Sequence, residues 1–93
     1  MEEIFKRWLR DTKNLSDNTI RNYTNRLKNI IPSKLVEVNF KEENVSLYDL
    51  SIEELKNINE LFEKNIYDFT YGNNGVYFRR MCFGYKNYYV KCL

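Results

Sequence analysis

The clearest helical signal in the chain is the stretch LSDNTIRNYTNRLKNII at residues 15–31. Ser16 is a suitable N-cap because its hydroxyl can accept a hydrogen bond from an amide of the first turn. Leu15 and Ile20 are spaced to form a hydrophobic staple across that cap. Apolar residues then recur at helical spacing as one core stripe of Ile20, Tyr23, Leu27, Ile30 and Ile31. The pattern predicts an amphipathic helix that ends at Pro32.

Two further helices are expected on either side of this stretch. The first runs from Ile4 to Thr12 and has an apolar stripe of Ile4, Phe5, Trp8 and Leu9. The second starts at Ser51, where Glu54 completes a capping box and Leu50 can pack on Leu55 as a staple. Its stripe consists of Ile52, Leu55, Ile58, Leu61, Phe62 and Ile66. Residues 33–50 predict a mostly irregular connection with one short helical turn.

The C-terminal segment has two interpretations on pattern alone. Residues 72–75, Gly-Asn-Asn-Gly, predict a turn. A helical stripe can follow, made of Phe78, Met81, Cys82, Tyr85, Tyr89 and Cys92. The aromatic content also fits a hairpin at about 75–92, with strands Val76–Phe83 and Tyr88–Cys92. We predict an all-α bundle of about four helices in a single domain, 1–93, with an α+β fold carrying this hairpin as the alternative.

Composition excludes several classes of function. The chain of 93 residues allows one modest core and no deep pocket. No apolar run approaches the ~18 residues that a membrane span needs. Histidine is absent, so the commonest general base and metal ligand is missing. Cys82 and Cys92 form neither a zinc motif nor a disulfide framework. We expect a cytoplasmic protein with no catalytic residue, metal, cofactor or small-molecule substrate.

Charge is segregated along the chain although the net charge is only +2. Residues 1–34 carry eight basic and four acidic side chains, and residues 69–93 carry four basic side chains and no acid. Residues 35–68 carry three basic and nine acidic side chains. If the two ends met in the fold they would form one basic face of about +8. Such a face favours an anionic partner.

The order of these signals resembles the core-binding domain of phage-type tyrosine recombinases. The resemblance rests on Phe5-x-x-Trp8-Leu9, on the Leu-Ser-x-x-Thr-x-x-x-Tyr motif that ends at Tyr23, and on Arg26-Leu27-Lys28. A similar domain occurs at the N-termini of some restriction endonucleases, and there the later part looks like Leu47-Tyr48-Asp49-Leu50 followed by Glu53-Glu54-Leu55. The resemblance covers roughly residues 3–91.

This resemblance implies a SAM-like helical bundle that grips duplex DNA as half of a clamp, and it favours a helix for the last segment. The chain departs from the family in two respects. The recombinase catalytic domain, with its arginines, histidines and nucleophilic tyrosine, has no counterpart in this sequence. The last helix of the family is usually rich in alanine, whereas residues 79–83 read RRMCF.

The outer face of the helix at 15–31 is the main candidate DNA contact. It carries Asn18, Arg21, Asn22, Asn25, Lys28 and Asn29, joined by Arg26. Arg and Asn make bidentate contacts to guanine and adenine edges in the major groove. Phosphate contacts are expected from Lys6, Arg10, Lys13, Arg79 and Arg80, with Lys86 and Lys91 extending the strip. The interleaved Tyr77, Tyr85, Tyr88 and Tyr89 could stack on bases of a single strand. An ordinary solvated face with half-buried tyrosines explains the same residues.

Three functional hypotheses remain open on the sequence. The first is a non-catalytic DNA-binding module, sequence-targeting or regulatory, of phage, mobile-element or restriction origin in a bacterial host. The second is a small phage-encoded inhibitor that binds a defence nuclease, either a CRISPR effector or a restriction enzyme. The third is an assembly adaptor that dimerises through the aromatic C-terminal segment. Duplex DNA is the partner that we expect first.

Overall fold

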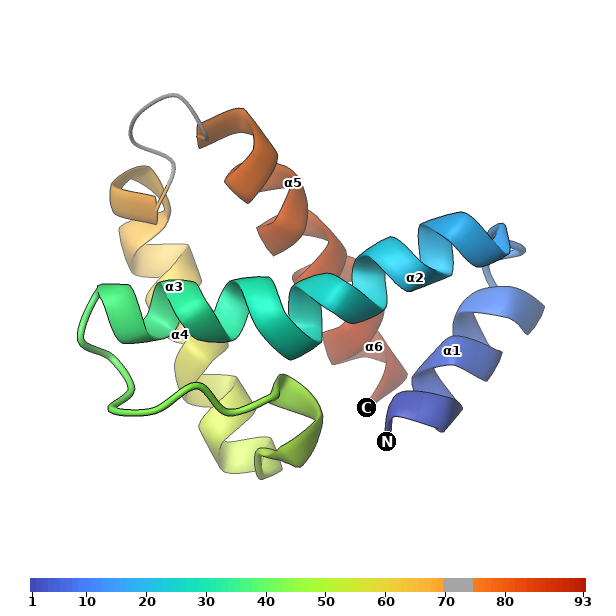
Figure 1. The fold of residues 1–93 in the computed structure, drawn as a ribbon, viewed down its shortest axis with the longest axis horizontal. Coiled ribbons are helices and arrows are strands. Elements are labelled where there is room, and N and C mark those ends of the chain that lie inside the picture. Colours follow the sequence, from blue (N-terminus) through green and yellow to red (C-terminus); the bar gives the residue numbers. More distant parts are fainter. Residues whose placement is uncertain (70–74) are drawn as a thin grey trace. The chain divides into compact units, whose positions relative to one another are not determined.

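The computed structural model describes the backbone of residues 1–69 and 75–93 and the side chains of residues 1–64 and 79–93. The regular secondary structure of these residues is all helical (Figure 1). The elements are α1 (Glu2–Asp11), α2 (Asp17–Asn25), the π-helical turn η1 (Arg26–Ile30), α3 (Ile31–Glu37), the 3-10 turn η2 (Leu47–Asp49), α4 (Ile52–Phe69), α5 (Gly75–Gly84), the π-helical turn η3 (Tyr85–Tyr89) and α6 (Val90–Cys92).

The predicted all-α fold is confirmed, and the alternative hairpin at 75–92 is wrong because that segment is helical. Contacts divide the chain into two compact units. The first unit is residues 1–50 with Cys92, and the second is residues 51–91 with Leu93. The single domain over 1–93 stays a prediction. Of the turn expected at 72–75, residues 72–74 lie outside the described residues, and Gly75 is the first residue of α5. The side chains of the stripe positions Ile66 and Phe78 are also outside the described part of the structure.

The helix predicted to end at Pro32 continues through it, so that prediction is wrong. The segments α2, η1 and α3 follow one another without a break and form one unbroken ribbon (Figure 1). Proline normally interrupts a helix because it has no N–H for the carbonyl four residues earlier. In η1 the spacing is five, and the Ile31 N–H bonds to the Arg26 carbonyl. In a π turn the hydrogen bonds span five residues instead of four, so a carbonyl of the i→i−4 pattern is left without an amide partner. This change in spacing occurs directly before α3, whose second residue is Pro32, the residue without an N–H donor.

The helix finally ends at Glu37, five residues beyond Pro32, with Val38 as its C-cap and Asn39 as the next residue. Asn39 has φ 61°, in the left-handed region. Its N–H bonds to the Val36 carbonyl at 3.0 Å, and the Phe40 N–H bonds to the Leu35 carbonyl at 2.9 Å. These two bonds form a Schellman motif, which satisfies carbonyls that the end of a helix leaves open. Asparagine serves there because it tolerates positive φ better than most residues.

Residues of the predicted apolar stripes form the core of the first unit. Ser16 caps α2, since its Oγ accepts from the Thr19 amide at 3.3 Å. The Phe5 and Tyr48 rings, from α1 and η2, lie 6.1 Å apart between centroids. The buried apolar residues are Phe5, Leu9, Ile20, Leu27, Ile31, Leu35 and Leu47. Ile4 was expected in the stripe of α1 but is 58% exposed, because its position in the first turn lies at the edge of the apolar face.

The second unit begins with the predicted capping box. The Glu54 N–H donates to Ser51 Oγ at 3.2 Å, and the Ser51 N–H donates to Glu54 Oε1 at 3.4 Å. The core of this unit consists of Leu55, Ile58, Phe62, Met81, Cys82, Tyr85 and Tyr89. The Phe62 and Tyr85 rings meet edge to face at 5.5 Å. Ile52, in the first turn of α4, is 60% exposed rather than part of the core.

None of the helices within 1–69 and 75–93 combines the length and apolar character that crossing a bilayer requires.

Replacing Asn39 tests the helix end. Asn39→Ala should lower the free energy of unfolding by about 1 kcal/mol, since a Cβ without a compensating polar group is disfavoured in the left-handed region. Asn39→Gly should be neutral or stabilising. Urea denaturation followed by circular dichroism measures both, with the exposed Asn44→Ala as control. Equal stabilities of the Ala and Gly variants would contradict the assignment.

A second stability test concerns the buried hydroxyl of Tyr85, which donates to the Leu55 carbonyl at 2.9 Å and ties η3 to α4. Tyr85→Phe keeps the ring packing and removes this bond, so the free energy of unfolding should fall by about 1 kcal/mol. Tyr88→Phe, at a half-buried neighbour, is the matched control and should lose less. Chemical denaturation of the two variants side by side makes the comparison.

Candidate nucleic-acid interface

The predicted outer face of the long helix is exposed in the structure. Its exposed polar residues run from α2 through η1 into α3 and are Asn18, Arg21, Asn22, Asn25, Lys28, Asn29 and Ser33. The chain has no acidic residue between Asp17 and Glu37. Because carboxylates stand only at the two ends, the middle of this helix presents amides and cations to solvent. We call these seven residues the outer face.

Two contacts organise side chains on and beside the outer face. The Asn29 Nδ2 donates to Asn25 Oδ1 at 2.7 Å, which fixes two amides one helical turn apart. The Arg26 guanidinium carbon lies 5.1 Å from the centre of the Tyr23 ring, a cation–π distance. Arg26 is only partly exposed, so its guanidinium flanks the outer face rather than standing on it. Arg21 and Asn22 are both exposed.

In the first unit, three of the cations predicted to contact phosphates or the groove form ion pairs. Glu2 lies between Lys6, at 3.5 Å, and Lys28, at 3.3 Å. Lys6 also lies 3.6 Å from Glu3, and Arg10 lies 3.5 Å from Asp17. Exposed pairs of this kind contribute little to stability. They nevertheless reduce the positive potential that these cations offer to an anion.

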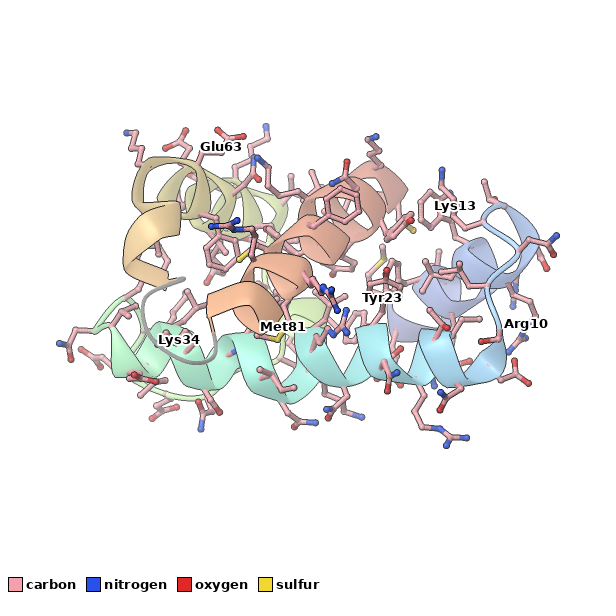
Figure 2. The ribbon with its side chains drawn as sticks, turned by 90° about the horizontal axis from the view of Figure 1, so that it is seen from above. Arg10, Lys13, Tyr23, Lys34, Glu63 and Met81 are labelled. Atoms are coloured by element: carbon pink, nitrogen blue, oxygen red, sulfur yellow. The ribbon has the colours of Figure 1, made fainter. Side chains whose placement is uncertain are left out.

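Arg10 lies in the last turn of α1, and Lys13 lies in the loop that joins α1 and α2 (Figure 2). The Lys13 ammonium is 5.4 Å from the Trp8 ring centre, so this side chain lies over an aromatic surface. Arg79 and Arg80 are exposed on α5 in the second unit. The basic face formed by both ends of the chain therefore stays a prediction, and the residues of each unit are considered separately.

The structure corrects the set of aromatics predicted to stack on bases. Tyr85 and Tyr89 are each 1% exposed, so neither ring can receive a base. Both belong to the helical stripe that also predicted their burial. Tyr77 lies outside the residues with described side chains. Phe83 is instead 58% exposed, on α5. Phe83 was not among the residues predicted to stack on bases, which were all tyrosines.

The two thiols are poor candidates for chemistry. Burial raises the pKa of the Cys82 thiol from 9.0 to about 12, which keeps it protonated and unreactive at neutral pH. Burial also raises the pKa of Cys92. Among the described residues no cluster of three or more Cys, Asp or Glu side chains could hold a metal ion.

Comparisons with known proteins give no relative for this chain. No protein-family model matches it, and no curated protein or solved structure is detectably similar. The resemblance to recombinase core-binding domains therefore stays a prediction based on its motifs.

Alkaline pH should destabilise the protein through Cys82. Its pKa is higher in the folded than in the unfolded chain, so the unfolded state loses the proton first as pH rises above about 9. The contribution of this thiol to stability should be constant below that pH and should fall between pH 9 and 10.5. Cys82→Ala should show a smaller fall over this interval, whatever its stability at pH 7. Denaturation midpoints measured at both ends of the interval decide this, and parallel falls would contradict it.

Proposed function

We propose that this chain is a non-catalytic DNA-binding module that places the outer face in the major groove of duplex DNA. The observation that supports this most is a long helix that has no acidic residue between its two ends, Asp17 and Glu37, and that exposes asparagines and Arg21. A major groove accommodates one α-helix and displays the donor and acceptor pattern that Arg and Asn read. An ordinary solvated helix would be expected to carry interspersed acids.

The residues divide into base-reading and phosphate-contacting groups. Arg21 is suited to guanine, and Asn22 and Asn25 to adenine, because each can form two hydrogen bonds to one base edge. Arg26 and Lys28 flank the groove. Lys6 and Arg10, from the first unit, and Arg79 and Arg80, from the second, would contact phosphates. Contact with DNA would exchange the ion pairs of Lys6, Arg10 and Lys28 for pairs with phosphate.

The biological setting remains part of the proposal. A sequence-targeting or regulatory module of phage, mobile-element or restriction origin, acting in the bacterial cytoplasm, fits the motif resemblance and the excess of basic over acidic side chains in residues 1–34. No chemistry is required of the chain in this role. Its contribution would be to select and hold a DNA site.

Fluorescence anisotropy with a labelled 30-base-pair duplex of mixed sequence tests the proposal. Affinity should fall steeply between about 50 and 200 mM salt, because phosphate neutralisation releases counterions. Arg21→Ala should weaken binding about tenfold, in line with the loss of a bidentate base contact. Lys56→Ala removes the same charge from an exposed position of α4 and should change affinity much less.

Two results would contradict the proposal. One is binding to the duplex that does not respond to salt, and the other is an equal loss in the Arg21→Ala and Lys56→Ala variants. Absence of duplex binding would favour the alternative hypothesis, a protein inhibitor of a CRISPR effector or a restriction enzyme. Co-purification with such an effector from the host would then be the measurement of choice.

A further inference from the structure

The C-terminal helical segment of the second unit carries a groove of about 410 Å³. The groove is lined by Arg79, Cys82, Phe83, Lys86, Asn87 and Lys91. Three of these six side chains are cationic and none is acidic, so the lining attracts anions. The exposed ring of Phe83 supplies an apolar surface among the cations. The groove belongs entirely to the second unit, and the outer face contributes nothing to it.

The π-helical turn η3 brings the three cations onto one side of the helix. In an uninterrupted α-helix at 3.6 residues per turn, Lys91 would be rotated by about 120° from Arg79. In η3 the Val90 N–H bonds to the Tyr85 carbonyl, five residues back. The wider turn uses more residues per rotation and so removes most of that offset. Arg79, Lys86 and Lys91 consequently line the same groove.

The position of Phe83 is fixed by its neighbours on the same helix. Its ring meets Tyr88 edge to face, with centroids 6.5 Å apart and planes at 87°. The Asn87 amide donates to the Phe83 carbonyl at 2.9 Å. A large apolar ring that stays 58% exposed despite these contacts is available to a ligand with a flat apolar face.

We propose that this groove binds single-stranded nucleic acid, with a base stacked on Phe83 and the flanking phosphates held by Arg79, Lys86 and Lys91. A single strand supplies both of the features that the groove complements, because unpaired bases present flat faces and phosphates alternate with them. An acidic peptide would match the charge and leave the ring without a partner. The proposal does not rest on duplex binding by the outer face.

Glu63 limits the charge of the groove. Its Oε1 lies 3.2 Å from the Lys86 ammonium, and Glu63 itself is not part of the lining. Glu63 lies on α4 (Figure 2). Because this carboxylate competes with phosphate for Lys86, its neutralisation should strengthen binding of a single strand.

Fluorescence anisotropy with the full chain and a labelled 12-nucleotide oligothymidine provides the test. Phe83→Ala should weaken binding about tenfold, the size expected for the loss of one base–aromatic stack, and Phe83→Trp should retain binding. Ile52→Ala, which truncates a similarly exposed apolar residue of α4, is the matched control and should leave binding unchanged. Glu63→Gln should tighten binding several-fold, while the exposed Glu53→Gln should have a smaller effect.

Further measurements distinguish binding at this groove from binding at the outer face, and binding of a single strand from binding of other anions. Arg21→Ala should leave oligothymidine binding intact, and Phe83→Ala should leave duplex binding intact. An abasic strand with the same phosphates should bind wild type about as weakly as oligothymidine binds Phe83→Ala. Equal binding of the abasic and thymidine strands, equal losses in Phe83→Ala and Ile52→Ala, or tighter binding of a polyglutamate peptide would each overturn the proposal.

Discussion

The missing amide hydrogen of Pro32 is the constraint on which the first unit depends. A regular α-helix would have to bend or end there, and the outer face would then be cut in half. The π turn Arg26–Ile30 accommodates the proline by moving the hydrogen bonds from four to five residues. The helix can then continue to Glu37, and the Schellman motif at Asn39 satisfies its last carbonyls. The buried Leu27, Ile31 and Leu35 all depend on this continuity.

The second unit also contains a π turn, and there it affects which side chains are buried and which are exposed. Its π turn, Tyr85–Tyr89, contains three tyrosines, and the first and last of them are fully buried. Tyr85 makes its hydroxyl bond to the Leu55 carbonyl from within this turn. The extra residue in the turn lets large rings face the core on one side, while Lys86 and Lys91 reach the groove on the other. One local change in helical pitch therefore allows both the burial of these rings in the core and the exposure of the two lysines in the groove.

Much of the helical structure could be predicted from local sequence chemistry. The Ser16 cap and the Ser51–Glu54 box depend on short-range hydrogen bonds, and both form as their motifs indicate. Passage of the helix through Pro32 could not be predicted, because it depends on a π turn that has no sequence signature. The alignment of Arg79 with Lys91 could not be predicted for the same reason, because it depends on the π turn η3. Exposure of Arg21 and Asn22 followed from periodicity, whereas the ion pairs of Lys6 and Lys28 depend on where Glu2 is placed in space.

The length of the uninterrupted helix has a consequence for how much DNA it could read. From Asp17 to Glu37 the axis measures about 30 Å at 1.5 Å per residue, close to the ~34 Å repeat of the double helix. A straight rod cannot follow a groove that winds around its axis by a full turn over that distance. Only one part of the rod can touch base edges at a time, and the remainder must leave the groove toward the backbone. A single copy would therefore contact only a few base pairs, which is too short a sequence to be unique in a genome. Recognition of a longer site would require a second DNA-contacting element.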